Sequence, residues 1–101
     1  MSGINTGGSE NGAAPLFSLG TILATPSALA VLTREDVENA LRRHAIGDWG
    51  CICQEDQLAN DEALRHGTRL LSAYESVDGV RFWVITEADR SSTTVLLPED
   101  C

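Results

Sequence analysis

The chain has 101 residues, of which 43% are hydrophobic, which is enough for one domain with a single core and too much for a disordered chain. It carries 15 acidic and 7 basic residues, a formal net charge of -8, and every basic residue is arginine. This balance excludes the lysine- and arginine-rich surface of a nucleic-acid-binding protein and favours a protein partner with a basic surface.

The start of the chain is rich in glycine and small polar residues, which predicts a flexible N-terminal tail over residues 1–15 and a single folded domain over residues 16–101. It lacks the basic start of a signal peptide. No apolar run approaches the ~18 residues of a membrane span. We therefore expect a cytoplasmic protein with no membrane segment.

The folded part opens with an apolar, partly β-branched segment, which predicts a short strand within residues 16–23. Thr25 and Pro26 then resemble an N-cap followed by proline at the first helical position, which predicts a short helix over residues 26–32. The chain therefore enters the domain with a strand that leads directly into a helix.

Two longer helices follow in the sequence. Thr33 and Asp36 form a capping-box pattern before a helix over residues 34–45, whose apolar residues recur on one face. A second amphipathic run predicts a helix over residues 55–65, and Gly67 supplies its C-terminal stop.

The C-terminal third predicts three antiparallel strands over residues 68–77, 80–87 and 92–97. Asp78-Gly79 joins the first two and is typical of a two-residue hairpin turn. A strand, then helices, then a meander is the element order of an α+β fold. We expect the N-terminal strand and the short helices to pack on an antiparallel meander of three to four strands.

A two-residue turn would also fix the register of the hairpin. Tyr74 would face Trp83 across the strands, on a mixed outer face that a partner could use. The helices would cover the opposite face, which would hold Leu71, Ala73, Val77, Val80, Phe82 and Val84.

The segment between the two longer helices carries one large aromatic residue and two cysteines. Trp49 is expected to fill the core between elements. Cys51 and Cys53 have a spacing that matches neither a redox pair nor a zinc knuckle, so we interpret them as packing or incidental cysteines in a reducing compartment. A metal site formed by these cysteines with His44 is the alternative. No motif calls for a cofactor.

Two blocks of sequence carry a family resemblance. One is Arg-His-Ala-Ile-Gly-Asp-Trp-Gly over residues 43–50, and the other is Trp-Val-Ile-Thr-Glu-Ala-Asp-Arg-Ser over residues 83–91, continued by Thr-Val-Leu-Leu-Pro-Glu over residues 94–99. They resemble a family of small uncharacterised bacterial proteins associated with plasmids and other mobile elements. The resemblance implies a setting on a mobile element and no particular activity.

One constellation could carry catalysis. His44 could serve as a general base, Glu87 as its partner and Arg90 as the stabiliser of an anionic transition state, which would suit a small hydrolase or ribonuclease-like enzyme. Each residue also has a simpler structural interpretation, as a boundary histidine or as part of a surface ion pair in a turn. No established catalytic motif decides whether the chain is an enzyme.

The other hypothesis is a small acidic binding or regulatory protein that docks on a basic protein partner. Its candidate contacts are the aromatic pair Tyr74 and Trp83 and the carboxylates Asp61, Glu62 and Asp89. A homodimer joined through the aromatic face is a further alternative. A continuous acidic stripe on the folded surface would favour docking, and a neutral or basic cleft around His44 would favour catalysis.

Overall fold

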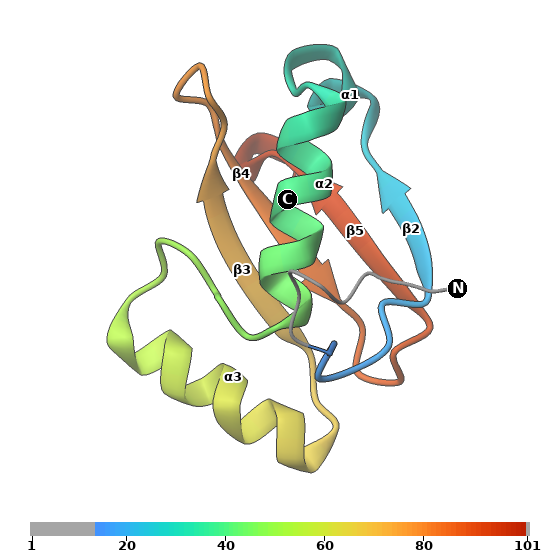
Figure 1. The fold of residues 1–101 in the computed structure, drawn as a ribbon, viewed down its shortest axis with the longest axis vertical. Helices are drawn as coiled ribbons and strands as arrows, with labels where there is room; N and C mark the ends of the chain where they lie inside the picture. Colours follow the sequence, from blue (N-terminus) through green and yellow to red (C-terminus); the bar gives the residue numbers. More distant parts are fainter. Residues whose placement is uncertain (1–13, 101) are drawn as a thin grey trace, which may run out of the picture.

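The computed structural model describes residues 14–100. The α+β class expected from the sequence is confirmed. The elements in chain order are β2 (Thr21–Ala24), α1 (Pro26–Val31), α2 (Arg34–Ala45), α3 (Gln54–His66), β3 (Leu70–Glu75), β4 (Arg81–Thr86), β5 (Ser92–Leu96) and a 3₁₀ turn η2 (Pro98–Asp100). Helix α2 crosses one face of a four-stranded sheet, and α3 lies beside the edge strand β3 (Figure 1).

The helix boundaries follow from local capping. The Thr25 hydroxyl oxygen accepts a hydrogen bond from the Ala28 N–H at 3.2 Å and begins α1. At the start of α2, the Asp36 N–H donates to the Thr33 hydroxyl and the Thr33 N–H donates to the Asp36 carboxylate, both at 3.0 Å, so the predicted capping box is present. Gly67 ends α3 at φ 69°, in the left-handed region.

The strand order is β2-β5-β4-β3. The predicted meander is confirmed, because β4 pairs antiparallel with both β3 and β5. β2 pairs in parallel with β5 and covers only Thr21–Ala24, a shorter strand than expected. Gly20 explains the late start: its φ is +65°, and a Cβ there would lie 2.4 Å from the Ser91 carbonyl oxygen, so the chain turns into the sheet at this glycine.

The predicted hairpin register is wrong by one residue. Tyr74 faces Phe82, and Ala73 faces Trp83. The loop has three residues and not two, since the Gly79 N–H donates to the Ser76 carbonyl, with Gly79 at φ +84°. A shift of one residue moves every side chain of a strand to the other face.

The corrected register changes the core. Phe82 and Val84 face the helices as expected, while Leu71 and Ala73 lie on the outer face and Val77 is exposed in the loop. Val80 packs at the border of the main cluster. That cluster joins α1 and α2 to the sheet through Ala28, Leu32, Ala40, Tyr74, Phe82, Val84, Val95 and Leu97.

A second cluster lies between α3 and the sheet. Trp49 is 5% exposed and packs there with Ala63 and Leu70, which confirms its expected place in the core. Next to it, Gly50 forms a bridge to Ala73 and covers the middle of the β3 edge. None of the helices in residues 14–100 is long and apolar enough to cross a membrane. The predicted N-terminal tail falls almost wholly outside the described residues.

Candidate docking site at the acidic end

His44 lies at the centre of a buried polar network and is 0% exposed. Its Nδ1 lies 2.5 Å from the Ser72 hydroxyl and its Nε2 lies 2.9 Å from the Thr86 hydroxyl. Thr86 in turn contacts the Thr93 hydroxyl at 2.8 Å, and Thr93 donates to the Leu19 carbonyl at 2.7 Å. The network therefore links α2 to three strands and to the segment before β2.

The direction of each hydrogen bond in this network follows from its last member. The Thr93 hydroxyl donates its hydrogen bond to the Leu19 carbonyl, because a carbonyl oxygen can only accept. Thr93 therefore accepts a hydrogen bond from the Thr86 hydroxyl. Thr86 must then accept a hydrogen bond from the Nε2–H of His44, and because burial lowers the pKa of the ring and keeps it neutral, Nδ1 accepts a hydrogen bond from the Ser72 hydroxyl. The imidazole is neutral, protonated at Nε2, and both ring nitrogens have a partner.

The surroundings of His44 keep it neutral. Burial lowers its pKa to about 4, and the charge of Arg90 acts in the same direction. The rings of Phe17 and Trp49 pack against it with centroids 5.3 and 5.5 Å away. His44 thus behaves as a satisfied core residue at neutral pH.

The other two catalytic candidates lie at the corner between β4 and β5. Arg90 adopts φ 62°, and its guanidinium donates to the carbonyls of Ala63, Thr68 and Glu87, which ties the corner to the end of α3. The Glu87 carboxylate points elsewhere and lies 4.0 Å from the Arg69 guanidinium. His44, Glu87 and Arg90 therefore do not line one cleft, and neither cysteine joins His44, because Cys51 and Cys53 are exposed.

The two aromatic binding candidates lie on opposite faces of the sheet. Tyr74 is 2% exposed, and its hydroxyl donates to the Asp48 carbonyl at 2.5 Å. Burial raises the pKa of Tyr74 to about 12, and the Arg43 guanidinium lies 4.7 Å from its ring centroid. Trp83 lies half-buried on the outer face opposite Ala73, so the expected Tyr74–Trp83 pair is absent.

The three acidic binding candidates lie around α3 and the β4–β5 corner. Asp61 accepts a hydrogen bond from the Trp49 indole N–H at 3.3 Å. Glu62 pairs with Arg65 at 2.9 Å. Asp89 accepts from the Ser91 N–H, and its hydrogen bonds to Ser91 lower the pKa of this exposed carboxyl. These side chains are exposed but already engaged locally.

A larger excess of acid lies at the opposite end of the molecule, where the start of α2, the β3–β4 loop and η2 come together (Figure 1). The Val77 N–H donates to the Asp36 carboxylate at 3.2 Å, and the Asp100 carboxylate accepts from the Thr25 and Ser27 hydroxyls at 2.6 Å. We call this region the acidic end; its carboxylates are Glu35, Asp36, Glu38, Glu75, Asp78, Glu99 and Asp100.

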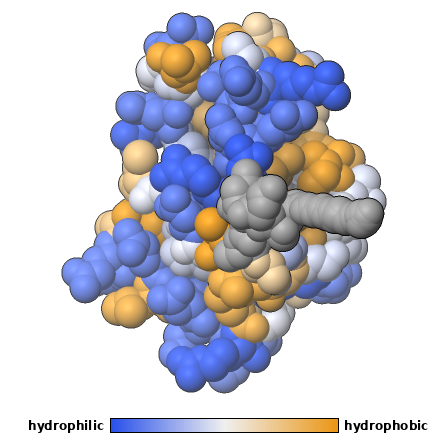
Figure 2. Space-filling view, viewed as in Figure 1, coloured by the Kyte–Doolittle hydropathy of each residue, from blue (hydrophilic) through white to orange (hydrophobic). Residues whose placement is uncertain are grey.

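Only two arginines accompany these seven carboxylates. Arg34 pairs with Glu38 at 3.2 Å, and Arg81 faces Glu75 across the strands. The hydrogen bonds to Thr33 lower the pKa of Asp36, so that this carboxylate stays ionised. Figure 2 shows the hydrophilic surface that results over the upper part of the molecule. The sequence reasoning missed this cluster, because Asp36 and Val77 are 41 positions apart.

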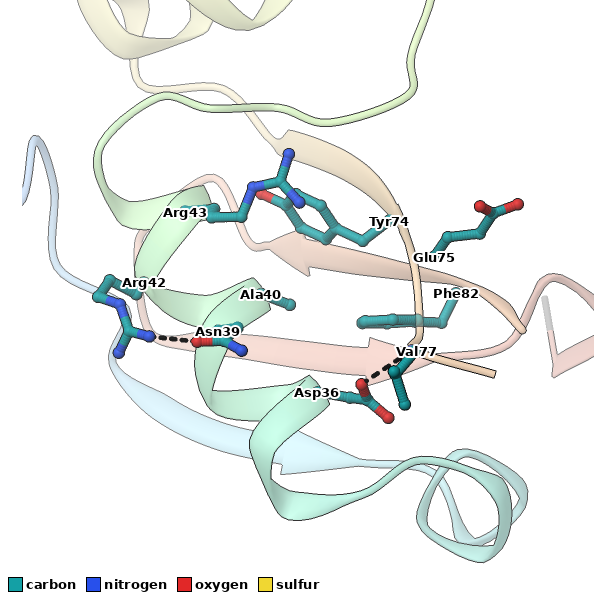
Figure 3. A pocket seen from close by; sticks show the side chains of 9 residues that line it. All are labelled: Asp36, Asn39, Ala40, Arg42, Arg43, Tyr74, Glu75, Val77 and Phe82. Carbon is teal, nitrogen blue, oxygen red and sulfur yellow. Dashed lines mark hydrogen bonds between the residues drawn. The ribbon is translucent and has the colours of Figure 1, made fainter. Parts of the chain in front are cut away.

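A groove of about 340 Å³ adjoins the acidic end, between α2 and the β3–β4 hairpin (Figure 3). Ala40, Tyr74 and Phe82 form its apolar part, and Asp36 and Glu75 border it. Arg42 and Arg43 also line it, but the Arg43 charge is balanced by Asp48 at 2.8 Å, and this pair raises the pKa of Arg43. Asn39 and Val77 complete the lining of the groove.

Comparisons with family models, curated proteins and solved structures returned no match for this chain. The resemblance to mobile-element proteins therefore stays a prediction.

Proposed function

We propose that the protein is a small acidic binding or regulatory protein of a mobile element that docks its acidic end on a basic protein partner. The observation that carries this proposal is the concentration of seven carboxylates from three distant segments against two arginines. The rest of the described chain holds seven carboxylates against five arginines, a smaller excess of negative charge. A field with this asymmetry attracts and orients a basic surface before contact.

The groove beside the acidic end suggests how such a partner would be held. An arginine or lysine of the partner could lay its aliphatic part against Val77, which lines the groove and is 83% exposed, with its charged group near Asp36 and Glu75. The proposal places the protein in the cytoplasm, where the exposed Cys51 and Cys53 stay reduced.

The hydrolase alternative is less favoured by the same geometry. A general base needs a ring nitrogen that can reach a substrate proton. Both nitrogens of His44 are occupied by Ser72 and Thr86, and the ring is fully buried.

Two matched double variants test the docking proposal. Glu35→Gln with Asp78→Asn removes two charges from the acidic end, and Asp61→Asn with Glu62→Gln removes two from α3 while keeping an acceptor for Trp49. A partner is first captured from the host at low salt, identified and purified, and its binding to each variant is then measured. We expect the first pair to weaken binding at least about tenfold and the second pair to change it little.

Ionic strength supplies a second readout. Binding by the acidic end should weaken from about 0.1 M to about 1 M salt, as the Debye length falls from about 10 to about 3 Å. The proposal would be contradicted if the affinity changed neither with salt nor in the Glu35→Gln, Asp78→Asn double variant. If the α3 pair had the larger effect, Asp61, Glu62 and Asp89 would be the contact site.

A further inference from the structure

The edge strand β2 lies in a region of the molecule that differs from the rest in charge. Residues 14–33 include β2 and α1 and contain no charged side chain, although the whole chain carries a net charge of -8. Eight large hydrophobic residues are exposed in the described part of the chain, and five of them lie in this stretch: Leu16, Ile22, Leu23, Leu29 and Val31. Figure 2 shows hydrophobic surface over β2, on the right side of the view.

The outer edge of β2 has no pairing partner among residues 14–100. The N–H groups of Thr21 and Thr25 donate to the carbonyls of Ser91 and Val95, so the alternate residues Ile22 and Ala24 direct their N–H and C=O groups away from the sheet. Natural edge strands are usually protected by a charge, a proline or a bulge. The sequence Thr-Ile-Leu-Ala of β2 contains none of these.

We propose that β2 is a homodimer interface, at which it pairs antiparallel with β2 of a second copy of this chain. A two-fold axis at Leu23 lets Ile22 of each copy exchange hydrogen bonds with Ala24 of the other copy, which uses the outward backbone groups of both residues. The two Leu23 side chains, 48% exposed in the single chain, then meet at the closely spaced pair on the outer face.

Charge identifies the second copy as the occupant of this edge. Two chains of net charge -8 repel wherever their carboxylates approach, and β2, which carries no charged side chain, lets them meet with the least like-charge contact. A basic peptide would find no carboxylate on β2 itself, and the Asp100 carboxylate beyond its end is already bonded to the Thr25 and Ser27 hydroxyls. The acidic end borders this region only beyond the end of β2, where this Asp100 contact lies.

The test is the mass of the full chain in solution, measured by sedimentation at about 1 to 100 µM. We expect a dimer at twice 10.8 kDa in the upper part of this range. Leu23→Lys places two like charges at the two-fold axis, and Ile22→Pro removes an outward N–H while leaving the bonds to β5. Each should weaken dimerisation at least about tenfold. Leu58→Lys, at a residue 58% exposed on α3, makes the same change elsewhere and should leave the dimer intact.

Circular dichroism of each variant shows whether it is folded, and added salt gives an independent readout. Salt should tighten the dimer by screening the repulsion between the copies, whereas it should loosen docking at the acidic end. A wild-type chain that stays monomeric over the whole range would overturn the proposal. So would a Leu23→Lys dimer as tight as wild type, or dimerisation that begins only when residues 1–13 are removed.

Discussion

The buried His44 makes the stability of this protein depend on pH. Its pKa is about 4 in the folded chain, whereas the ordinary pKa of an exposed histidine is 6.5. Because the unfolded chain binds this proton more readily, the stabilisation is complete above pH 6.5 and is lost as pH falls toward 4. The full effect is about 3 kcal/mol, from a difference of about 2.5 pKa units at 1.36 kcal/mol each.

The useful window for this measurement lies between pH 7 and pH 5. Over that range the linkage relation predicts a loss of about 2 kcal/mol in the free energy of unfolding. The pKa values of Asp36 and Asp48 lie below their ordinary value of 3.8 because of hydrogen bonds to Thr33 and Arg43, so their contribution is lost only at lower pH. His44 therefore dominates the slope in this window.

Urea denaturation at a series of pH values measures the effect. Wild type should lose about 2 kcal/mol between pH 7 and pH 5, and His44→Gln should be less stable at pH 7 but nearly flat over the same window. Nitrogen NMR of the wild-type ring gives a second readout that needs no variant, and it should show a neutral imidazole protonated at Nε2 at pH 5. A ring that titrates near 6.5, or equal slopes in both proteins, would refute the reasoning.

Other predictions concern packing and backbone geometry. Trp49→Ala and Phe82→Ala, at residues 5% and 1% exposed, should each lower the free energy of unfolding by about 3–5 kcal/mol, and a variant that melts like wild type would place its residue outside the core. Gly79→Ala faces open space at positive φ and should cost about 1–2 kcal/mol, as seen in urea denaturation. Gly50→Ala should cost clearly more, because its Cβ would lie 2.0 Å from the Ala73 carbonyl oxygen; equal losses would contradict that contact.

The parts of the fold that were predicted correctly depend on short-range chemistry. The capping box of Thr33 and Asp36 and the left-handed stop at Gly67 each involve residues within one or two turns, so the helices were found within about one residue of their ends. The parallel pairing of β2 with β5 was not predicted, because no local pattern links Thr21 to Ser92.

The register error has two physical causes. The turn at Asp78-Gly79 is lengthened by Ser76, whose hydroxyl oxygen accepts from the N–H groups of both Asp78 and Val80. The hydrophobic pattern of β3 also favoured Leu71 over Ser72 as a core residue. Ser72 is nevertheless fully buried, because its hydroxyl bonds to His44, a contact between residues 28 positions apart.

The two surfaces that we assign to function differ in how far the sequence alone predicts them. Charge composition alone predicted a basic partner, but it could not say which carboxylates act together, because the acidic end is assembled by contacts such as Asp36 with Val77. The uncharged stretch over residues 14–33 was readable in the sequence, yet its meaning depends on β2 lying at an open edge of the sheet. An acidic end and an uncharged edge respond to salt in opposite directions, since screening weakens attraction to a basic partner and relieves repulsion between copies. A single salt titration that follows partner binding and dimer mass together therefore distinguishes the two roles.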